Sequence, residues 1–292
     1  MTTTRTGRSF PISVIADVPM GPGHHSEDET LDYLVMPQGM STFRAPPLPE
    51  PEAMAGQHGA LRVLQATLDA VAGRGPTQIP LDTLAVADLT LVNQVLGEGE
   101  VSAQWLTAGD DKRCAQVQES VFAGVWRVVE TAADGSRHDR IEVGTVPAVL
   151  RQAAIDDAAH PPEVAGEPPA GVLNATHVLA ELAQHRAAWQ PGWASAVVNL
   201  TLLPMSPADI AWMDHVLGTG RVLILSRGYG NCRITSTRVP HTWRVVYYNS
   251  QDHVILNTVE VGELPAVALA APEDLADTQE RLAEVLQWVA RS

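Results

Sequence analysis

Few residues in this sequence could bind a metal ion. The chain has two cysteines, Cys114 and Cys232, so it cannot by itself supply the four thiolates of a zinc or iron–sulfur site. Three histidines lie in the same region as Cys232: His215, His241 and His253. Their spacing matches no metal-ligand signature, so we interpret Cys232 as a structural cysteine and expect no resident cofactor. Handling of nickel or iron by Cys232 and these histidines is the alternative.

Nucleotide binding and nucleophilic catalysis are not indicated either. The glycine pairs Gly97/Gly99 and Gly218/Gly220 each close a helical pattern and precede a β-rich run. A phosphate-binding loop follows a strand and opens a helix, so this order predicts helix ends instead. The Gly-x-Ser-x-Gly pattern of hydrolases is absent. The sequence therefore predicts a protein that is not an enzyme.

The clearest chemical feature is a run of arginines. Residues 221–248 carry a charge of +5 with no acidic residue, in a chain whose net charge is −15. The arginines are Arg221, Arg227, Arg233, Arg238 and Arg244. Two interpretations remain open: the arginines pair with acidic hairpins of the first half of the chain across a pseudo-twofold interface, or they bind a partner.

The turn at residues 226–232 favours partner binding. It reads Ser-Arg-Gly-Tyr-Gly-Asn-Cys, so two glycines flank a tyrosine beside an arginine. Tyrosine and arginine are enriched among the residues that dominate binding energy at interfaces, although a plain β-turn with a surface tyrosine is the simpler interpretation. The predicted partner-binding residues are Arg227, Tyr229, Asn231, Arg233, Arg238 and Arg244.

Composition limits the remaining classes. The 292 residues are 45% hydrophobic, which is enough for a substantial core. The 34 acidic against 19 basic residues argue against binding to nucleic acid or to anionic membranes. No apolar run reaches the length of a membrane span, so we expect no membrane insertion, and no signal peptide opens the sequence. We expect a cytoplasmic protein.

Three sequence blocks recur in the same order. Residues 88–99 match residues 209–220, Trp-Arg-Val-Val at 126–129 recurs at 243–246, and the block at 141–149 recurs at 259–267. This self-similarity predicts an internal duplication. We expect an extended acidic, Pro/Gly-rich arm over residues 1–55, a first copy over 56–160, a linker over 161–174 and a second copy over 175–292.

Each copy is expected to be α+β, with an antiparallel sheet packed against helices. An amphipathic helix is predicted at residues 58–72 and 176–189, followed by a short strand and a second helix. Four β-rich runs joined by short turns then follow in each copy, and a closing helix ends it. Trp126 and Trp243 are predicted to be buried equivalents on the sheet face that packs against the second helix.

The arginine-rich region resembles a known family. The Ser-Arg-Gly-Tyr-Gly-Asn-Cys string, with Asn-Ser-Gln-Asp at 249–252 and Ile-Leu-Asn-Thr-Val-Glu-Val at 255–261, is similar to the C-terminal region of the HupH/HyaF (HoxQ-like) family of NiFe-hydrogenase expression proteins. The arm is similar to the same family in Leu-Asp-Tyr-Leu at 31–34 and Met-Pro-Gln-Gly-Met at 36–40.

This resemblance implies a non-catalytic maturation factor. The implied partners are the iron–sulfur small-subunit precursor of a hydrogenase, bound before export, and a thioredoxin-like accessory protein. The first copy lacks the Ser-Arg-Gly-Tyr-Gly string, so a binding role of that turn transfers only to the second copy. The family offers no catalytic residues that map onto this chain.

Overall fold

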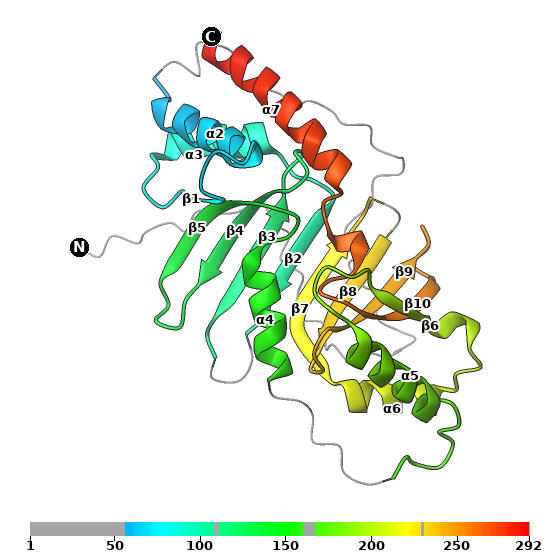
Figure 1. Ribbon diagram of the computed structural model, residues 1–292. Coiled ribbons are helices and arrows are strands. Elements are labelled where there is room, and N and C mark those ends of the chain that lie inside the picture. Colours follow the sequence, from blue (N-terminus) through cyan, green and yellow to red (C-terminus); the bar gives the residue numbers. More distant parts are fainter. Residues whose placement is uncertain (1–55, 108–110, 160–166, 229–230, 292) are drawn as a thin grey trace.

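The computed structural model describes residues 56–107, 111–159, 167–228 and 231–291 (Figure 1). The predicted arm over residues 1–55 and part of the predicted linker lie outside the described residues. Among the residues that are described, none of the helices combines the length and apolar content needed to cross a bilayer.

One antiparallel sheet of ten strands forms the centre of the fold. Its order is β1-β5-β4-β3-β2-β7-β8-β9-β10-β6. The strands of the first half are β1 (Gln78–Pro80), β2 (Val101–Trp105), β3 (Cys114–Glu119), β4 (Val125–Thr131) and β5 (Arg137–Val143). Those of the second half are β6 (Ala196–Asn199), β7 (Thr219–Ser226), β8 (Asn231–Thr237), β9 (Thr242–Tyr248) and β10 (Val254–Val261). The α+β prediction is confirmed.

The two halves contain the same series of elements, arranged symmetrically about the β2–β7 pair. In each, a helix, a short edge strand and a second helix precede four strands, and the fourth strand pairs with the edge strand. At the centre, β2 pairs with β7 so that Ala103 lies opposite Ile224, a sequence offset equal to that between residues 88–99 and 209–220. An approximate twofold axis therefore passes through this pair. The duplication that the recurring blocks suggest stays a prediction.

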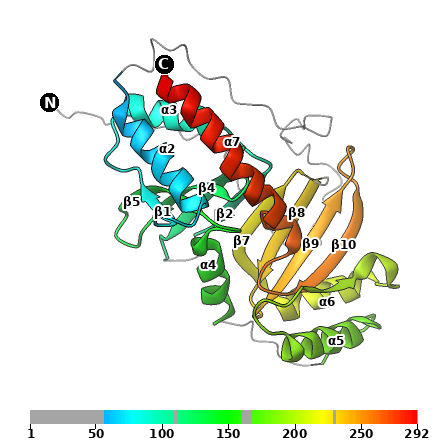
Figure 2. The same cartoon turned by 45° about the horizontal axis from the view of Figure 1, so that its top comes forward.

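Helices cover the two faces of the sheet unequally (Figures 1 and 2). The first face packs against α4 (Ala148–Ala158) and is called the α4 face. On the opposite face, α2 (His58–Val71) and α3 (Val86–Leu96) cover the first half, and α5 (Ala175–Ala188) and α6 (Pro207–Leu217) cover the second. The long C-terminal helix α7 (Pro272–Arg291) lies along α2. The short 3-10 helices η1 (Leu200–Leu202) and η2 (Ala266–Ala268) complete the second half.

An acidic residue at the start of the second helix anchors the first helix in both halves. Asp209 and Ser206 form a reciprocal capping box at α6, and the other oxygen of Asp209 accepts hydrogen bonds from the backbone at residues 173–175, where α5 begins. Asp88 of α3 likewise accepts a 2.8 Å hydrogen bond from the Ala60 amide of α2. Burial acts to raise the pKa of Asp209, but these hydrogen bonds hold it well below its ordinary value.

The two tryptophans are buried, as predicted, but on the other face. Trp126 and Trp243 are 1% and 2% exposed, and their indole nitrogens donate to the carbonyl oxygens of Gly144 and Glu263. Both rings belong to the core of the α4 face, so the prediction that they face the second helix was wrong. Strand alternation instead directs the following arginine of each Trp-Arg pair toward α3 or α6.

Replacing Trp243 by alanine is expected to lower the free energy of unfolding by about 3–5 kcal/mol, because it leaves a large cavity in the α4-face core. Trp126→Ala should cost a similar amount, since that ring occupies the equivalent place. Urea denaturation followed by circular dichroism measures both losses. Leu173→Ala, at a side chain 72% exposed, is the control and should change stability little. A Trp243→Ala protein as stable as this control would contradict the burial argument.

Candidate functional site

The pairing of β2 with β7 places the arginine-bearing turn beside the first half. Just past the end of this ladder, the Arg227 amide donates a 3.1 Å hydrogen bond to the Glu100 carbonyl. A Cβ atom on Gly228 would collide with the Glu100 carboxylate. The Glu100 carboxylate therefore lies against the turn, and the backbone hydrogen bond from Arg227 fixes the β7 end of the turn against the first half.

The structure brings together only part of the predicted set. Leu225 pairs with Arg233 and Ser226 with Cys232, so Arg227, Asn231 and Arg233 lie around one end of the β7–β8 hairpin. Arg227 is exposed, and the other two are partly exposed. Tyr229 lies outside the described residues.

The remaining two arginines are placed elsewhere. Arg238 follows the opposite end of β8, where its amide donates to the Leu217 carbonyl at the end of α6. Arg244 is 8% exposed and lies beneath α6, with its Nη1 3.6 Å from Asp214 Oδ1. Arg244 is therefore buried beneath a helix and is not part of an exposed binding surface.

Burial is the main cause of the pKa shifts of Arg244 and Asp214. It lowers the pKa of Arg244 and raises the pKa of Asp214 to about 6, although each group's charge partly offsets the effect on the other. Arg244 Nε and Nη1 and Asp214 Oδ2 have no hydrogen-bond partner among the described residues. In the first half, the equivalent Arg127 donates to both Asn93 and Asp139.

The fifth arginine, Arg221, joins the two halves. Its Nη1 lies 2.8 Å from Asp111 Oδ2 and its Nε 2.6 Å from Asp157 Oδ1, both in the first half. The guanidinium also stacks on Trp105, at 5.3 Å from the ring centroid. Hydrogen bonds from Arg113 and then from Arg221 hold the pKa of Asp111 below its ordinary value. Arg221 therefore fits the first interpretation of the arginine run, in which the arginines pair with acidic residues of the first half.

An acidic group lies next to the arginine-bearing turn. Glu119, at the end of β3, is 7% exposed and accepts a 3.3 Å hydrogen bond from the Gly124 amide. Burial raises the pKa of Glu119 to about 7, and the charges of Glu100 and Asp274 act in the same direction. Glu119 is thus a buried acid that titrates near neutral pH, and it senses the charge of Glu100, the residue whose carbonyl holds the turn.

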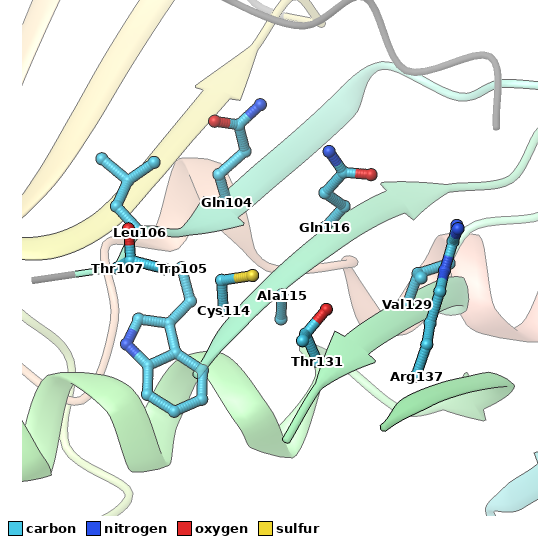
Figure 3. Close-up of a pocket in the computed structure, with 10 residues that line it drawn as sticks. All are labelled: Gln104, Trp105, Leu106, Thr107, Cys114, Ala115, Gln116, Val129, Thr131 and Arg137. Atoms are coloured by element: carbon cyan, nitrogen blue, oxygen red, sulfur yellow. The ribbon is translucent and has the colours of Figure 1, made fainter. Parts of the chain in front are cut away.

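The sequence did not predict the polar hollow on the sheet shown in Figure 3. It has a volume of about 390 Å³, and its side chains come from β2 to β5 and the residues after β2. Gln104 and Gln116 project from neighbouring strands, with the partly exposed thiol of Cys114 beside them (Figure 3). The signal in the sequence that could have indicated this hollow is the polar residue at alternate positions of β2 and β3.

The structure does not assemble the alternative metal-handling set. Cys232 is 3% exposed, and burial raises the pKa of its thiol to about 12. His215 lies against Trp212 and His241 against Trp189, while the His253 amide donates within a turn to Asn249. In the described part of the chain, no three His, Cys, Asp or Glu side chains gather in a way that could hold a metal ion.

Comparison with known proteins identifies relatives that are all named as hydrogenase expression or hydrogenase operon proteins. The model of the C-terminal conserved region of HupH hydrogenase expression proteins matches residues 59–163 and 172–289. The chain is 54% identical to the hydrogenase expression/formation protein HoxQ of Cupriavidus necator, over 96% of this chain and 98% of that protein. It is 43% identical to HupH of Rhodobacter capsulatus, covering 93% and 96% of the two chains. It is 30% identical to the hydrogenase-1 operon protein HyaF of Escherichia coli, covering 94% and 96%.

Glu119 is expected to make stability fall as pH rises. Its pKa is about 7 in the folded protein against an ordinary 4.5, so between these values the folded state holds a proton that the unfolded chain has released. The associated loss amounts to about 3 kcal/mol across that window. Glu119→Gln should flatten the pH dependence measured by urea denaturation, whereas Glu98→Gln, at an exposed carboxylate, should leave it unchanged. Equal slopes in the two variants would show that Glu119 is ionised throughout.

Proposed function

The chain belongs to the family of HupH hydrogenase expression proteins, and from this premise we propose that it is a non-catalytic maturation factor that binds the iron–sulfur small-subunit precursor of a NiFe-hydrogenase before export. The names of the relatives support a role in hydrogenase maturation. Binding of the precursor, action beside a thioredoxin-like accessory protein, and a place in the cytoplasm are the finer parts of this proposal.

The observation that carries the proposal is the exposed basic end of the β7–β8 hairpin. Arg227 and Arg233 lie there together, while Arg221 and Arg244 are engaged in internal ion pairs. An immature small subunit exposes cysteine thiolates or partly assembled clusters, and both are anionic. One exposed and one partly exposed arginine at this end of the hairpin are suited to such a surface, because electrostatic complementarity speeds encounter and fixes orientation.

A non-catalytic role fits the chemistry of the described residues. A nucleophile needs a neighbouring base, and a metal catalyst needs a preformed ligand set. Cys232 is buried with a raised thiol pKa, which keeps it protonated and unreactive. The described groups whose pKa shifts most toward neutrality are Glu119, which is buried, and Asp214, whose side chain is 12% exposed, and neither lines the hollow of Figure 3.

The binding surface is tested by reversing its charge. Arg227→Glu with Arg233→Glu should reduce capture of the small-subunit precursor by about tenfold, since two attractive contacts become repulsive. Capture is measured by pull-down from hydrogenase-producing cells, with circular dichroism to check folding. The matched control is Arg62→Glu with Arg74→Glu, two exposed arginines on and just after α2 that change the net charge equally.

Full capture by the folded double variant would place the precursor on another surface. Equal loss in the control pair would show that capture responds to total charge and not to this hairpin. Raising the salt concentration should weaken capture by the unmodified protein, because the steering field is screened.

A second variant separates binding from metal handling. Cys232→Ala should leave hydrogenase activity in a complemented deletion strain unchanged, because the side chain serves only as a small core residue. The matched readout is iron and nickel content of the purified protein, for which we expect no stoichiometric metal or cluster. Loss of hydrogenase activity with a variant of unchanged stability and lower metal content would favour metal handling.

A further inference from the structure

The outer edge of the second half is unusually apolar. The strand β6 pairs with β10 on one side, and among the described residues no strand pairs with its other side. Val197 on this strand is 55% exposed, Trp193 before it is 60% exposed, and Leu202 after it is 80% exposed. A bare strand edge with exposed apolar side chains is a template for pairing with another strand.

Further apolar side chains extend this surface along the neighbouring strand. The Asn257 amide of β10 donates a 2.8 Å hydrogen bond to Thr201 Oγ1, which holds η1 against β10. Leu203 follows η1, and Val254 and Ile255 begin β10, so these exposed residues lie at the same end of the sheet. We call the set the β6 edge: Trp193, Val197, Leu202, Leu203, Val254 and Ile255.

The other edge of the same sheet is protected. Its strand β1 has only three residues, with Ile79 buried and Pro80 at its end. Proline lacks the amide that an added strand would need, and short strands with polar neighbours resist edge-to-edge pairing. The two halves therefore share a topology but differ at their outer edges, and only the second presents an apolar one.

Charge indicates what covers the β6 edge. Residues 187–208 contain no Asp, Glu, Lys, Arg or His, although the chain as a whole has a net charge of −15. Two copies of such an acidic chain repel one another over most of their surfaces. This segment removes that obstacle to close approach, because its own side chains are uncharged and the acid opposite Val197 on β10, Glu260, is only 7% exposed. A charged client would instead be selected by complementary side chains, which this segment lacks.

We propose that two copies of this chain associate through their β6 edges to form a twofold-symmetric dimer. A twofold axis beside β6 pairs the two strands antiparallel and joins two ten-stranded sheets. Trp193 and Leu202 lie at opposite ends of β6, so the Trp193 end of one copy meets the Leu202 end of the other. The same patch is used by both copies, which is the property of an isologous interface.

The dimer leaves the proposed client surface open. The hairpin of β7 and β8 lies at the middle of the sheet, with β9 and β10 between it and β6. Figure 1 shows β6 at the outer side of the second half, away from α2 and α3. Dimerisation and precursor capture are therefore expected to respond to different substitutions.

Sedimentation velocity across a dilution series of the full chain tests the dimer. The unmodified protein should sediment as a species of twice the 31.3 kDa chain mass and dissociate on dilution. Leu202→Lys should weaken association by at least about tenfold, because it buries a charge against the Trp193 end of the other copy. Val197→Lys should weaken it less, because Glu260 lies opposite Val197 on β10 and pairs with the new lysine. Val86→Lys is the control, at an exposed valine on α3 far from this edge, and should dimerise normally.

Several outcomes would overturn the proposal. These are a chain that is monomeric at every concentration, lysine variants that dimerise as tightly as the unmodified protein, and a control that loses the dimer to the same extent. A monomer whose precursor capture is abolished by Val197→Lys would assign the edge to the client instead.

Salt separates this proposal from the proposed function. Screening reduces the repulsion between two acidic copies, so the dimer should strengthen as salt rises while precursor capture weakens. The Arg227→Glu, Arg233→Glu variant should still dimerise. A dimer that dissociates as salt rises would contradict an uncharged interface.

Discussion

The antiparallel pairing of β2 with β7 is the interaction on which the rest of the structure depends. It makes one sheet from two five-stranded halves and buries Ala103 against Ile224 at the approximate twofold axis. The Arg221 ion pairs with Asp111 and Asp157 reinforce it, because they tie β7 to the end of α4. The core of the α4 face continues across this junction, so neither half completes that core alone, whereas the cores on the opposite face are separate.

The same pairing determines the arrangement of the arginines. Alternation along β7, β8 and β9 directs every second side chain into the α4-face core and leaves the others on the opposite face. On that face, α6 covers Arg244, whereas Arg233 lies nearer the middle of the sheet, where it is partly exposed. Arg227 lies beyond the last paired residue of β7 and is exposed. One arginine run therefore has three roles. Arg221 joins the two halves by ion pairs, Arg244 forms a buried pair, and Arg227 and Arg233 contribute to the surface.

Local signals predicted the elements well. Gly97 and Gly218 indicated the ends of α3 and α6, and recurring blocks placed equivalent helices and strands in both halves. The sequence could not show that β2 would pair with β7, because that contact joins residues far apart in the chain. For the same reason the burial of Arg244 was hidden, since its partner Asp214 lies on a different element and the alternation alone leaves both faces possible. The uncharged stretch was visible, but its position at a sheet edge was not.

The two halves differ in how completely their interiors satisfy polar groups. Arg127 of the first half has carboxylate and amide acceptors in Asp139 and Asn93. Arg244 of the second half has Asp214 at 3.6 Å, and the Asn257 oxygen near it on β10 has no partner among the described residues. Buried polar atoms without partners cost stability, so the surroundings of this arginine are better satisfied in the first half than in the second. The second half carries both the exposed arginines and the apolar β6 edge, and of these two surfaces the pairing of β2 with β7 directly positions only the arginine-bearing turn.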